Sequence, residues 1–427
     1  MKETSERYAL NNELHARPFP RLSTPSNAVY LALRKPTDAT DRAAERAHLL
    51  ALLDRFGTAH PAPDAAHFSG EIGRHQLKWE MHTEFVTYTI FSDDNSGTPF
   101  ARTLFDAFPA DWLQSAPGEV LTSAMVWIEP IKDDVARDKI ITERLPNWFV
   151  TESLAVSDVV DHEATIAGDF RIDENGHIRF AVLTRPGIGQ QRLGRIVQRL
   201  LEIETYQAAS MLTLPVARDV AARVSALDEK LAALVLDMSN QKGDDADTLD
   251  RLLSMSAEIE FLSASTAYRF GAAGAYEAIV THRIQVLRET RIGGRQLFSE
   301  FMMRRYDPAM RTCRSAEWRL GSLSSRAERA ADLLRTRVDV EAGIQNTEVL
   351  KQMDRRAELQ LRLQETVEGL SVVAISYYAV SLMGYVIGPV EKIAHISKTW
   401  LMAMVTIPVV LLVFLAIRRI RKKVGHH

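Results

Sequence analysis

Two runs without a charged residue near the C-terminal end constrain the fold of this chain more than any other feature. The first spans 369–390 and reads GLSVVAISYYAVSLMGYVIGPV, and the second spans 399–417 and reads TWLMAMVTIPVVLLVFLAI. Each is close to the roughly 20 residues that a helix needs to cross a bilayer. Backbone groups in lipid must be hydrogen-bonded within the segment, so such runs form helices. The alternative is a pair of buried core helices in a large soluble protein.

Cations flank the two runs on their outer sides. The second run ends in RRIRKK, and the first follows a segment that contains Lys351, Arg355, Arg356 and Arg362. The connection EKIAHISK contains only two cations. Because Lys and Arg are enriched on the cytoplasmic side of membrane helices, we predict a transmembrane hairpin with the N- and C-termini in the cytoplasm. The lipid bilayer is then one partner of the chain.

The first run is the less apolar of the two, because small and hydroxylated residues interrupt it. Such residues let helices pack closely in a membrane, and they also line aqueous pores. We favour the interpretation that these residues pack helices together in an oligomer. The alternative is that they line a pore. The candidate pore-lining residues are Ser376, Tyr377, Ser381, Gly384, Tyr385 and Gly388.

Long amphipathic helices are predicted ahead of the hairpin. Between Pro308 and Gly369 there is no proline, and apolar residues recur at steps of three and four, as in a long helix or coiled coil. Helical patterns also cover 189–238, where Pro215 predicts a bend, and 246–292. We therefore predict a long-helix bundle or stalk over 186–368. Its apolar stripe requires other helices of the chain or other copies, which favours a homo-oligomer.

The first 185 residues have a mixed pattern. Strands are expected at 28–34 and 121–131, a strand or strand pair at 75–92, a hairpin at 164–184, and a helix at 38–57. The predicted fold is an α+β cytoplasmic domain with a mostly antiparallel sheet over 1–185, then the helical stalk, then the transmembrane hairpin and basic tail over 369–427.

Composition and motifs exclude several classes of function. The formal net charge is −3, so no overall basic surface indicates nucleic acid. The single cysteine, Cys313, cannot form a disulfide within the chain. No phosphate-binding loop or metalloprotease motif is present. We expect neither an enzyme nor a resident cofactor.

One polar, histidine-bearing cluster is the candidate site of the soluble domain. Alternation along a strand predicts that Glu80, His82 and Glu84 share one face, where a divalent cation or Arg17 could meet them. The interpretation that we favour is a hydrogen-bonded clasp that docks the N-terminal segment on the sheet. A catalytic centre is the third possibility. The cluster comprises Glu13, His15, Arg17, His75, Glu80, His82 and Glu84, with His162 and Glu163 as further members.

Three stretches resemble a bacterial family of uncharacterised, predicted membrane-anchored proteins. They read NELHARPFP, LKWEMHTEF and LGRIVQRLLEIETYQAASMLTLPVAR, and the likeness extends over essentially the whole chain. The family is a domain of unknown function. The resemblance implies the bacterial inner membrane as the location.

The architecture also resembles that of the CorA-type magnesium and cobalt transporters, in which the first span lines a pentameric pore and ends in Gly-Met-Asn. Here the corresponding residues are Leu382-Met383-Gly384-Tyr385, without the Asn. We therefore predict a membrane-anchored homo-oligomer with a partner- or ligand-binding cytoplasmic domain. The alternative is a CorA-like cation channel, for which we would expect a pentamer.

Overall fold

The computed structural model describes residues 4, 7–8, 11, 18–34, 42–93, 97–240, 245–387 and 398–424. The chain divides into two compact units, Met1–Ala331 and Asp332–His427. Helix α10 (Asp307–Ile387) begins in the first unit and ends in the second. Each unit is described by itself.

A nine-stranded mixed sheet forms the centre of the first unit, in the order β2-β3-β4-β1-β5-β8-β7-β6-β9. The β5–β8 pair is parallel and the other pairs are antiparallel. The α+β class with a largely antiparallel sheet is therefore confirmed. The strands are β1 (Ser26–Arg34), β2 (His67–Ile72), β3 (His75–Met81), β4 (Phe85–Ser92), β5 (Glu119–Pro130), β6 (Ala155–Val159), β7 (Ala164–Gly168), β8 (Ile178–Thr184) and β9 (Thr290–Arg291).

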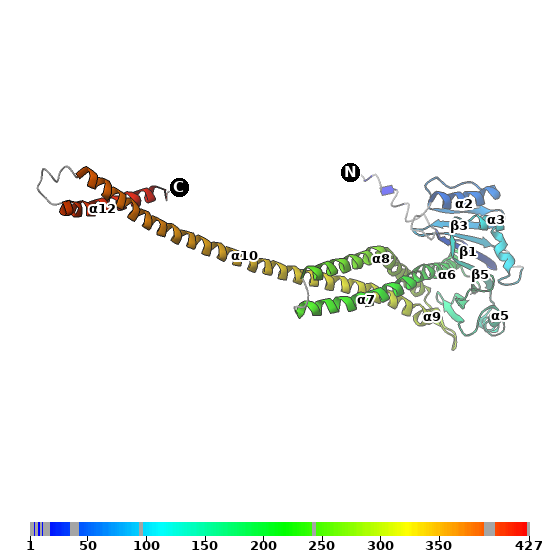
Figure 1. Cartoon of the computed structure of the whole chain (residues 1–427). Coiled ribbons are helices and arrows are strands. Elements are labelled where there is room, and N and C mark those ends of the chain that lie inside the picture. Colours follow the sequence, from blue (N-terminus) through cyan, green and yellow to red (C-terminus); the bar gives the residue numbers. More distant parts are fainter. Residues whose placement is uncertain are drawn as a thin grey trace. The chain divides into compact units, whose positions relative to one another are not determined.

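Helices cover both faces of this sheet (Figure 1). Val29, Leu31 and Leu33 of β1 point to one face, where they share a core with apolar residues of α2 (Arg42–Arg55). Successive side chains of a strand alternate between faces, so Tyr30 lies on the other face, under α6 (Gln190–Met211). We call these the α2 face and the α6 face. Because both are covered, the central strands are apolar nearly throughout.

Short helices follow several of the strands and add aromatic side chains to the core. Trp112 of α3, for example, is buried in the core of the α2 face. These helices are η1 (Arg102–Ala107), α3 (Ala110–Gln114), α4 (Asp134–Lys139), η2 (Ile140–Arg144), α5 (Leu145–Trp148) and α9 (Phe298–Arg305).

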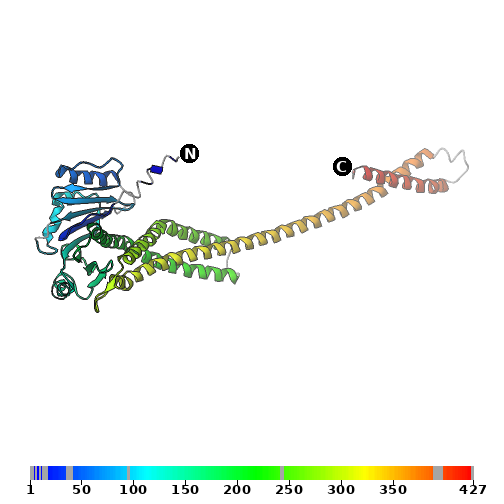
Figure 2. The same ribbon diagram turned by 180° about the vertical axis from the view of Figure 1, so that it is seen from behind.

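The predicted helix bundle is present in the first unit, where α7 (Thr213–Ser239), α8 (Asp245–Leu287) and the start of α10 lie side by side (Figure 2). Leu227 of α7, Ile259 of α8 and Leu323 of α10 are all buried. Helices α6 and α7 are separate at Leu212, shortly before Pro215. The interruption thus lies three residues before the proline at which the sequence predicts a bend.

Of the two alternatives for the segment 75–92, the strand pair is confirmed, since β3 ends at Met81 and β4 begins at Phe85. Two other sequence expectations need correction. The helix expected over 246–292 ends at Leu287, and Thr290–Arg291 instead pair with β6 as β9. Three strands, β2, β6 and the short β9, were not predicted. Residues 38–41 of the predicted first helix lie outside the described residues.

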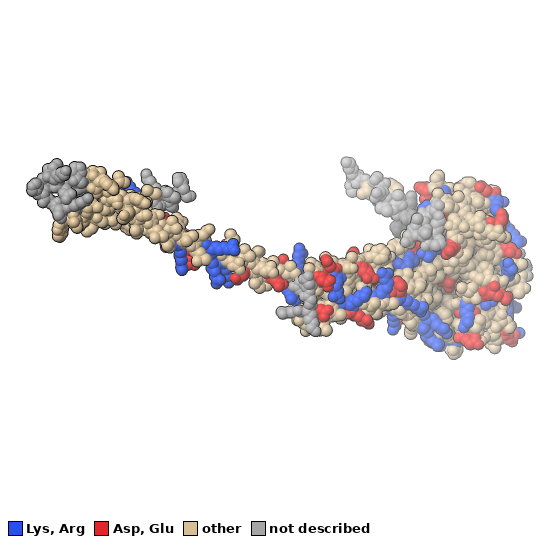
Figure 3. Space-filling view, viewed as in Figure 1, with Lys and Arg blue, Asp and Glu red and all other residues tan. Residues whose placement is uncertain are grey.

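The second unit contains the rest of α10 and helix α12 (Lys398–Val424). Both helices have an apolar window long enough to cross a membrane. Only 6% of the window in α10 is buried, and none of that in α12. The last turns of α10 present a surface without Lys, Arg, Asp or Glu (Figure 3). These windows are therefore not the core of a soluble domain in the described structure.

Candidate functional site

The predicted cluster is only partly described by the structure. Glu13, His15 and Arg17 lie outside the described residues. His75 lies on the α2 face at the start of β3, where its Nδ1 is 2.5 Å from the Ser92 hydroxyl. It therefore lies on the opposite face from Glu80, and these two predicted members are not brought together.

A cavity of about 250 Å³ lies between the α6 face of the sheet and helix α6. Two of the predicted residues, Glu80 and His82, line it. The cavity is mixed in character, with hydroxyl, carboxylate, ammonium and guanidinium groups beside aromatic rings. Its lining residues are Phe19, Pro20, Tyr30, Lys78, Glu80, His82, Phe85, Thr87, Thr89, Phe91, Gln198, Leu201, Glu202, Thr205, Tyr206 and Arg283.

A chain of polar contacts crosses the cavity from β3 to α8. The Lys78 ammonium lies 3.1 Å from a Glu80 oxygen and donates to Gln198 at 2.9 Å. Gln198 donates to Glu202 at 2.7 Å, and the other oxygen of Glu202 accepts from Arg283. Lys78 is 7% exposed, so a buried ammonium is held between an acid and an amide. The two cations and two carboxylates balance, and the cavity offers both donors and acceptors.

His82 and Glu84 lie in the turn between β3, which ends at Met81, and β4. His82 stacks on Phe85 at 4.6 Å between ring centroids, and its Nδ1 lies 3.5 Å from the Tyr206 hydroxyl. Glu84 instead forms a buried ion pair with Arg269 of α8. His82 thus lines the same cavity as Glu80, as predicted, whereas Glu84 is not among the lining residues.

The segment just after the predicted polar stretch docks on α6. Phe19 and Pro20 line the cavity, and the Leu22 amide donates to the Gln190 carbonyl at 3.2 Å. Pro20 contacts the helix backbone at Gly194, where a side chain would not fit. We call residues 18–22 the strap. The strap covers α6, while the clasp predicted for Glu13, His15 and Arg17 stays a prediction.

Two buried titratable groups of the α6 face have shifted pKa values. Burial raises the pKa of Glu204 to about 7, although the Thr122 hydroxyl donates to its carboxylate at 3.0 Å. Burial also raises the pKa of the Tyr30 hydroxyl, which contacts the Thr205 hydroxyl at 2.6 Å. Tyr30 is therefore neutral at physiological pH, whereas Glu204 titrates close to it.

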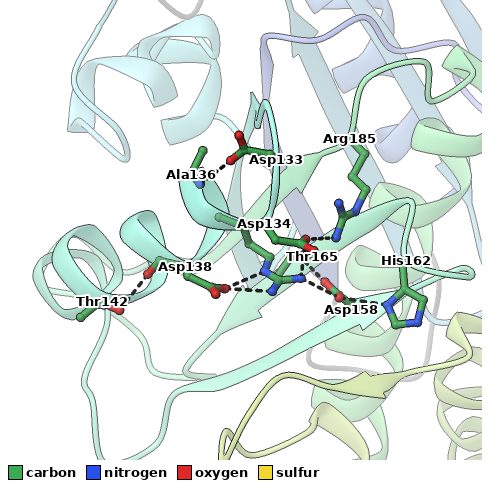
Figure 4. A network of polar contacts seen from close by, with 10 residues as sticks. Asp133, Asp134, Ala136, Asp138, Thr142, Asp158, His162, Thr165 and Arg185 are labelled. Carbon is green, nitrogen blue, oxygen red and sulfur yellow. Dashed lines mark hydrogen bonds and ion pairs between the residues drawn. The ribbon is translucent and has the colours of Figure 1, made fainter.

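A second polar cluster joins α4 to β6 (Figure 4). Arg137 pairs with Asp134, Asp138 and Asp158, and the Asp158 carboxylate also contacts His162 Nδ1 at 3.1 Å. His162 is thus held here and not beside His82. The three aspartates share the guanidinium of Arg137, which joins α4 to β6. This arrangement indicates that the cluster is structural.

No group of three or more His, Cys, Asp or Glu side chains that could hold a metal ion is present among the described residues. His75, Glu80, His82 and Glu84 thus do not come together as such a group within the described structure. With Glu13 and His15 outside the described residues, the metal site remains a sequence-based hypothesis.

The candidate pore-lining residues differ in their surroundings within the second unit. Ser376 is 5% exposed, whereas Tyr377 and Tyr385 are exposed. The sulfur of Met402 in α12 lies 3.0 Å from the position that a Cβ on Gly384 would take. Gly384 therefore lets α10 and α12 approach each other. Ser381 is half-buried, and Gly388 lies outside the described residues.

The fold and the cavity define a class: an α+β domain with long helices and two C-terminal apolar helices of membrane-spanning length. The family described as "Protein of unknown function (DUF3422)" matches residues 2–424, and the chain belongs to this family. This confirms the resemblance to an uncharacterised family. The chain matches no curated protein. The comparisons do not support the likeness to CorA-type transporters.

Proposed function

We propose that this protein is a membrane-anchored binding protein whose α+β domain takes up a small polar ligand in the cavity between the sheet and α6. The observation that carries the proposal is a cavity lined by paired charges and hydroxyls where an apolar core would otherwise continue. Burying such groups costs free energy unless they are hydrogen-bonded, so their retention beside open volume supports a binding role.

The ligand that fits this lining carries a positive and a negative charge, or hydrogen-bond donors as well as acceptors. Lys78 and Arg283 supply positive charge, Glu80 and Glu202 negative charge, and Phe85 and Tyr206 flat apolar surface. A volume of about 250 Å³ accommodates a molecule the size of a small zwitterion.

Native mass spectrometry of the detergent-purified chain tests this proposal. We expect a small molecule bound to the chain, and its loss in Arg283→Gln. The matched control is Arg223→Gln, because Arg223 also pairs with a glutamate, Glu258, but does not line the cavity. A chain that carries no molecule, or an equal loss in both variants, would contradict the proposal.

Anchoring through the end of α10 and α12 is the second part of the proposal. The exposure of both apolar windows supports a lipid environment, because water disfavours such a surface. We place the anchor in the bacterial inner membrane with both termini cytoplasmic, as the flanking cations favour.

We also propose a homo-oligomer. Val340, Ile344, Leu350 and Leu359 of α10 are all more than half exposed, and a second copy of the helix is the simplest cover for them. The contact between Gly384 and Met402 favours packing over pore lining for the first span. Cation flux into liposomes tests the alternative of a channel: flux that ends when Ser381 or Gly384 is made bulky would replace our proposal.

A further inference from the structure

A second hollow lies between the start of α6 and the end of α8, and it shares no lining residue with the cavity. It is an open groove of about 630 Å³. Arginine dominates its walls. The lining residues are Val160, Arg192, Arg195, Arg199, His282, Gln285, Val286 and Arg288.

Helical spacing brings three of the four arginines to one side of the groove. Arg192, Arg195 and Arg199 follow each other at steps of three and four, so they share one face of α6. Arg288 comes from the residue after the end of α8 and completes the opposite wall. Like charges at such spacing repel each other, so the arrangement is costly unless it has a use.

The two arginines at the rim are held by carboxylates. Arg192 pairs with Glu163, and Arg288 pairs with Asp161 at 2.8 Å. Both acids belong to the turn between β6 and β7. This turn holds Val160, Asp161 and His162 at φ of 52°, 60° and 66°, a conformation that a β-branched residue such as Val rarely adopts. The Val160 amide donates to the Leu287 carbonyl at 2.8 Å, which fastens the turn to α8.

The two inner arginines, Arg195 and Arg199, are not paired with a carboxylate in this way among the described residues. Arg199 donates to the Val286 carbonyl at 3.1 Å, and Arg195 lies over the Phe19 ring at 5.9 Å. Neither forms an ion pair with any residue that the structure describes. Burial and then the charges of Arg195 and Arg283 lower the pKa of Arg199, and the nearby Glu202 carboxylate opposes this shift. Among the described residues the groove is thus lined by four arginines, and only the two at the rim form ion pairs with carboxylates.

We propose that this groove binds the phosphate group of a small anionic molecule, with Arg195 and Arg199 as the principal contacts and Arg192 and Arg288 at the rim. Guanidinium groups present paired N–H donors that match the oxygens of a phosphate, and several of them around one anion favour a multiply charged ligand. A nucleic acid is a poorer fit, because it requires an extended basic surface and the chain has a net charge of −3.

This inference is independent of the cavity ligand. No residue of the polar chain from Lys78 to Arg283 lines the groove. Failure of one proposal therefore leaves the other intact.

Calorimetric titration of pyrophosphate into the full chain in detergent, at low ionic strength, tests the proposal. We expect binding that weakens by about 30-fold or more in R195Q/R199Q, since each charge-assisted contact contributes more than a neutral hydrogen bond. The matched control is R304Q/R305Q, which removes the same charge from exposed arginines of α9. The single variant R195E leaves the bond from Arg199 to Val286 in place and keeps the test valid if the double variant does not fold.

A parallel arm distinguishes the source of the phosphate. Native mass spectrometry of the same variants in micelles doped with phosphatidic acid reports headgroup binding. Pyrophosphate binding that is lost only in the groove variants supports the proposal with a soluble ligand. If the wild-type chain binds phosphatidic acid but not pyrophosphate, and the groove variants lose this binding, the ligand is a lipid headgroup and the proposal is supported. Equal behaviour of wild type, R195E and R304Q/R305Q towards both probes would overturn it.

Discussion

The carbonyl oxygen of Pro20 occupies the space that a Cβ atom on Gly194 would need. The strap therefore lies directly on the backbone of α6, and glycine is the residue that permits this contact. Because Phe19 and Pro20 also line the cavity, the same contact sets one wall of the proposed binding site.

Gly194→Ala is expected to displace the strap and to destabilise the first unit by about 1–3 kcal/mol, as overpacking does. Thermal unfolding followed by tryptophan fluorescence measures the change. Gly271→Ala is the control, because nothing lies within 4 Å of a Cβ at that position in α8. The control is expected to be neutral or to stabilise by about 0.5–1 kcal/mol. Equal stability of both variants would show that the strap does not bear on α6.

Glu204 is expected to make stability depend on pH. Its pKa is raised to about 7 in the folded state, so the folded chain binds its proton more tightly than the unfolded chain. The contribution of the protonated Glu204 to the stability is then fully present below pH 4.5, decreases as pH rises through 7, and is lost above it. The loss is on the order of 3 kcal/mol. Unfolding of wild type and Glu204→Gln between pH 5 and pH 8.5 tests this, and a constant difference between them would contradict it.

Arg269 and Glu84 are expected to depend strongly on each other. Their side chains are only 12% and 7% exposed, and Oε2 of Glu84 is buried without a hydrogen-bond partner among the described residues. Arg269→Met leaves a buried carboxylate without its counter-charge, at a cost of about 3–5 kcal/mol. Adding Glu84→Leu should recover much of that loss. A double variant no more stable than Arg269→Met would refute the coupling.

Local patterns predicted the elements of the fold where burial follows a simple period. Alternation along 28–34 and the apolar run at 121–131 located β1 and β5. The strand β6 was not predicted because its buried residues include the polar Ser157 and Asp158, which are stabilised there by long-range partners. No local pattern encodes those partners.

Only two of the residues that line the cavity belong to the polar cluster predicted from the sequence. Glu80 and His82 were selected because polar residues alternate along the chain there, but Gln198, Glu202 and Arg283 come from helices distant in sequence. A signal did exist, since Gln198 and Glu202 lie four residues apart on the face of α6 that also buries Leu201. Which strand that face would meet depends on the packing of the whole unit.

The arginine groove had a similar signal. Arg192, Arg195 and Arg199 were visible as a basic stripe on a predicted helix, but Arg288 and the acids of the β6–β7 turn join them only in the folded chain. Tertiary structure also distinguishes the paired arginines from the unpaired ones.

Membrane attachment through residues 369–417 is the central claim, and fractionation tests it most directly. Cells expressing the full chain and a chain that ends at residue 368 are broken without detergent, washed with alkaline carbonate and floated in a density gradient, which separates membranes from aggregates. The full chain should float with the membranes, and the shortened chain should not. A full chain that stays in the soluble fraction would contradict the account.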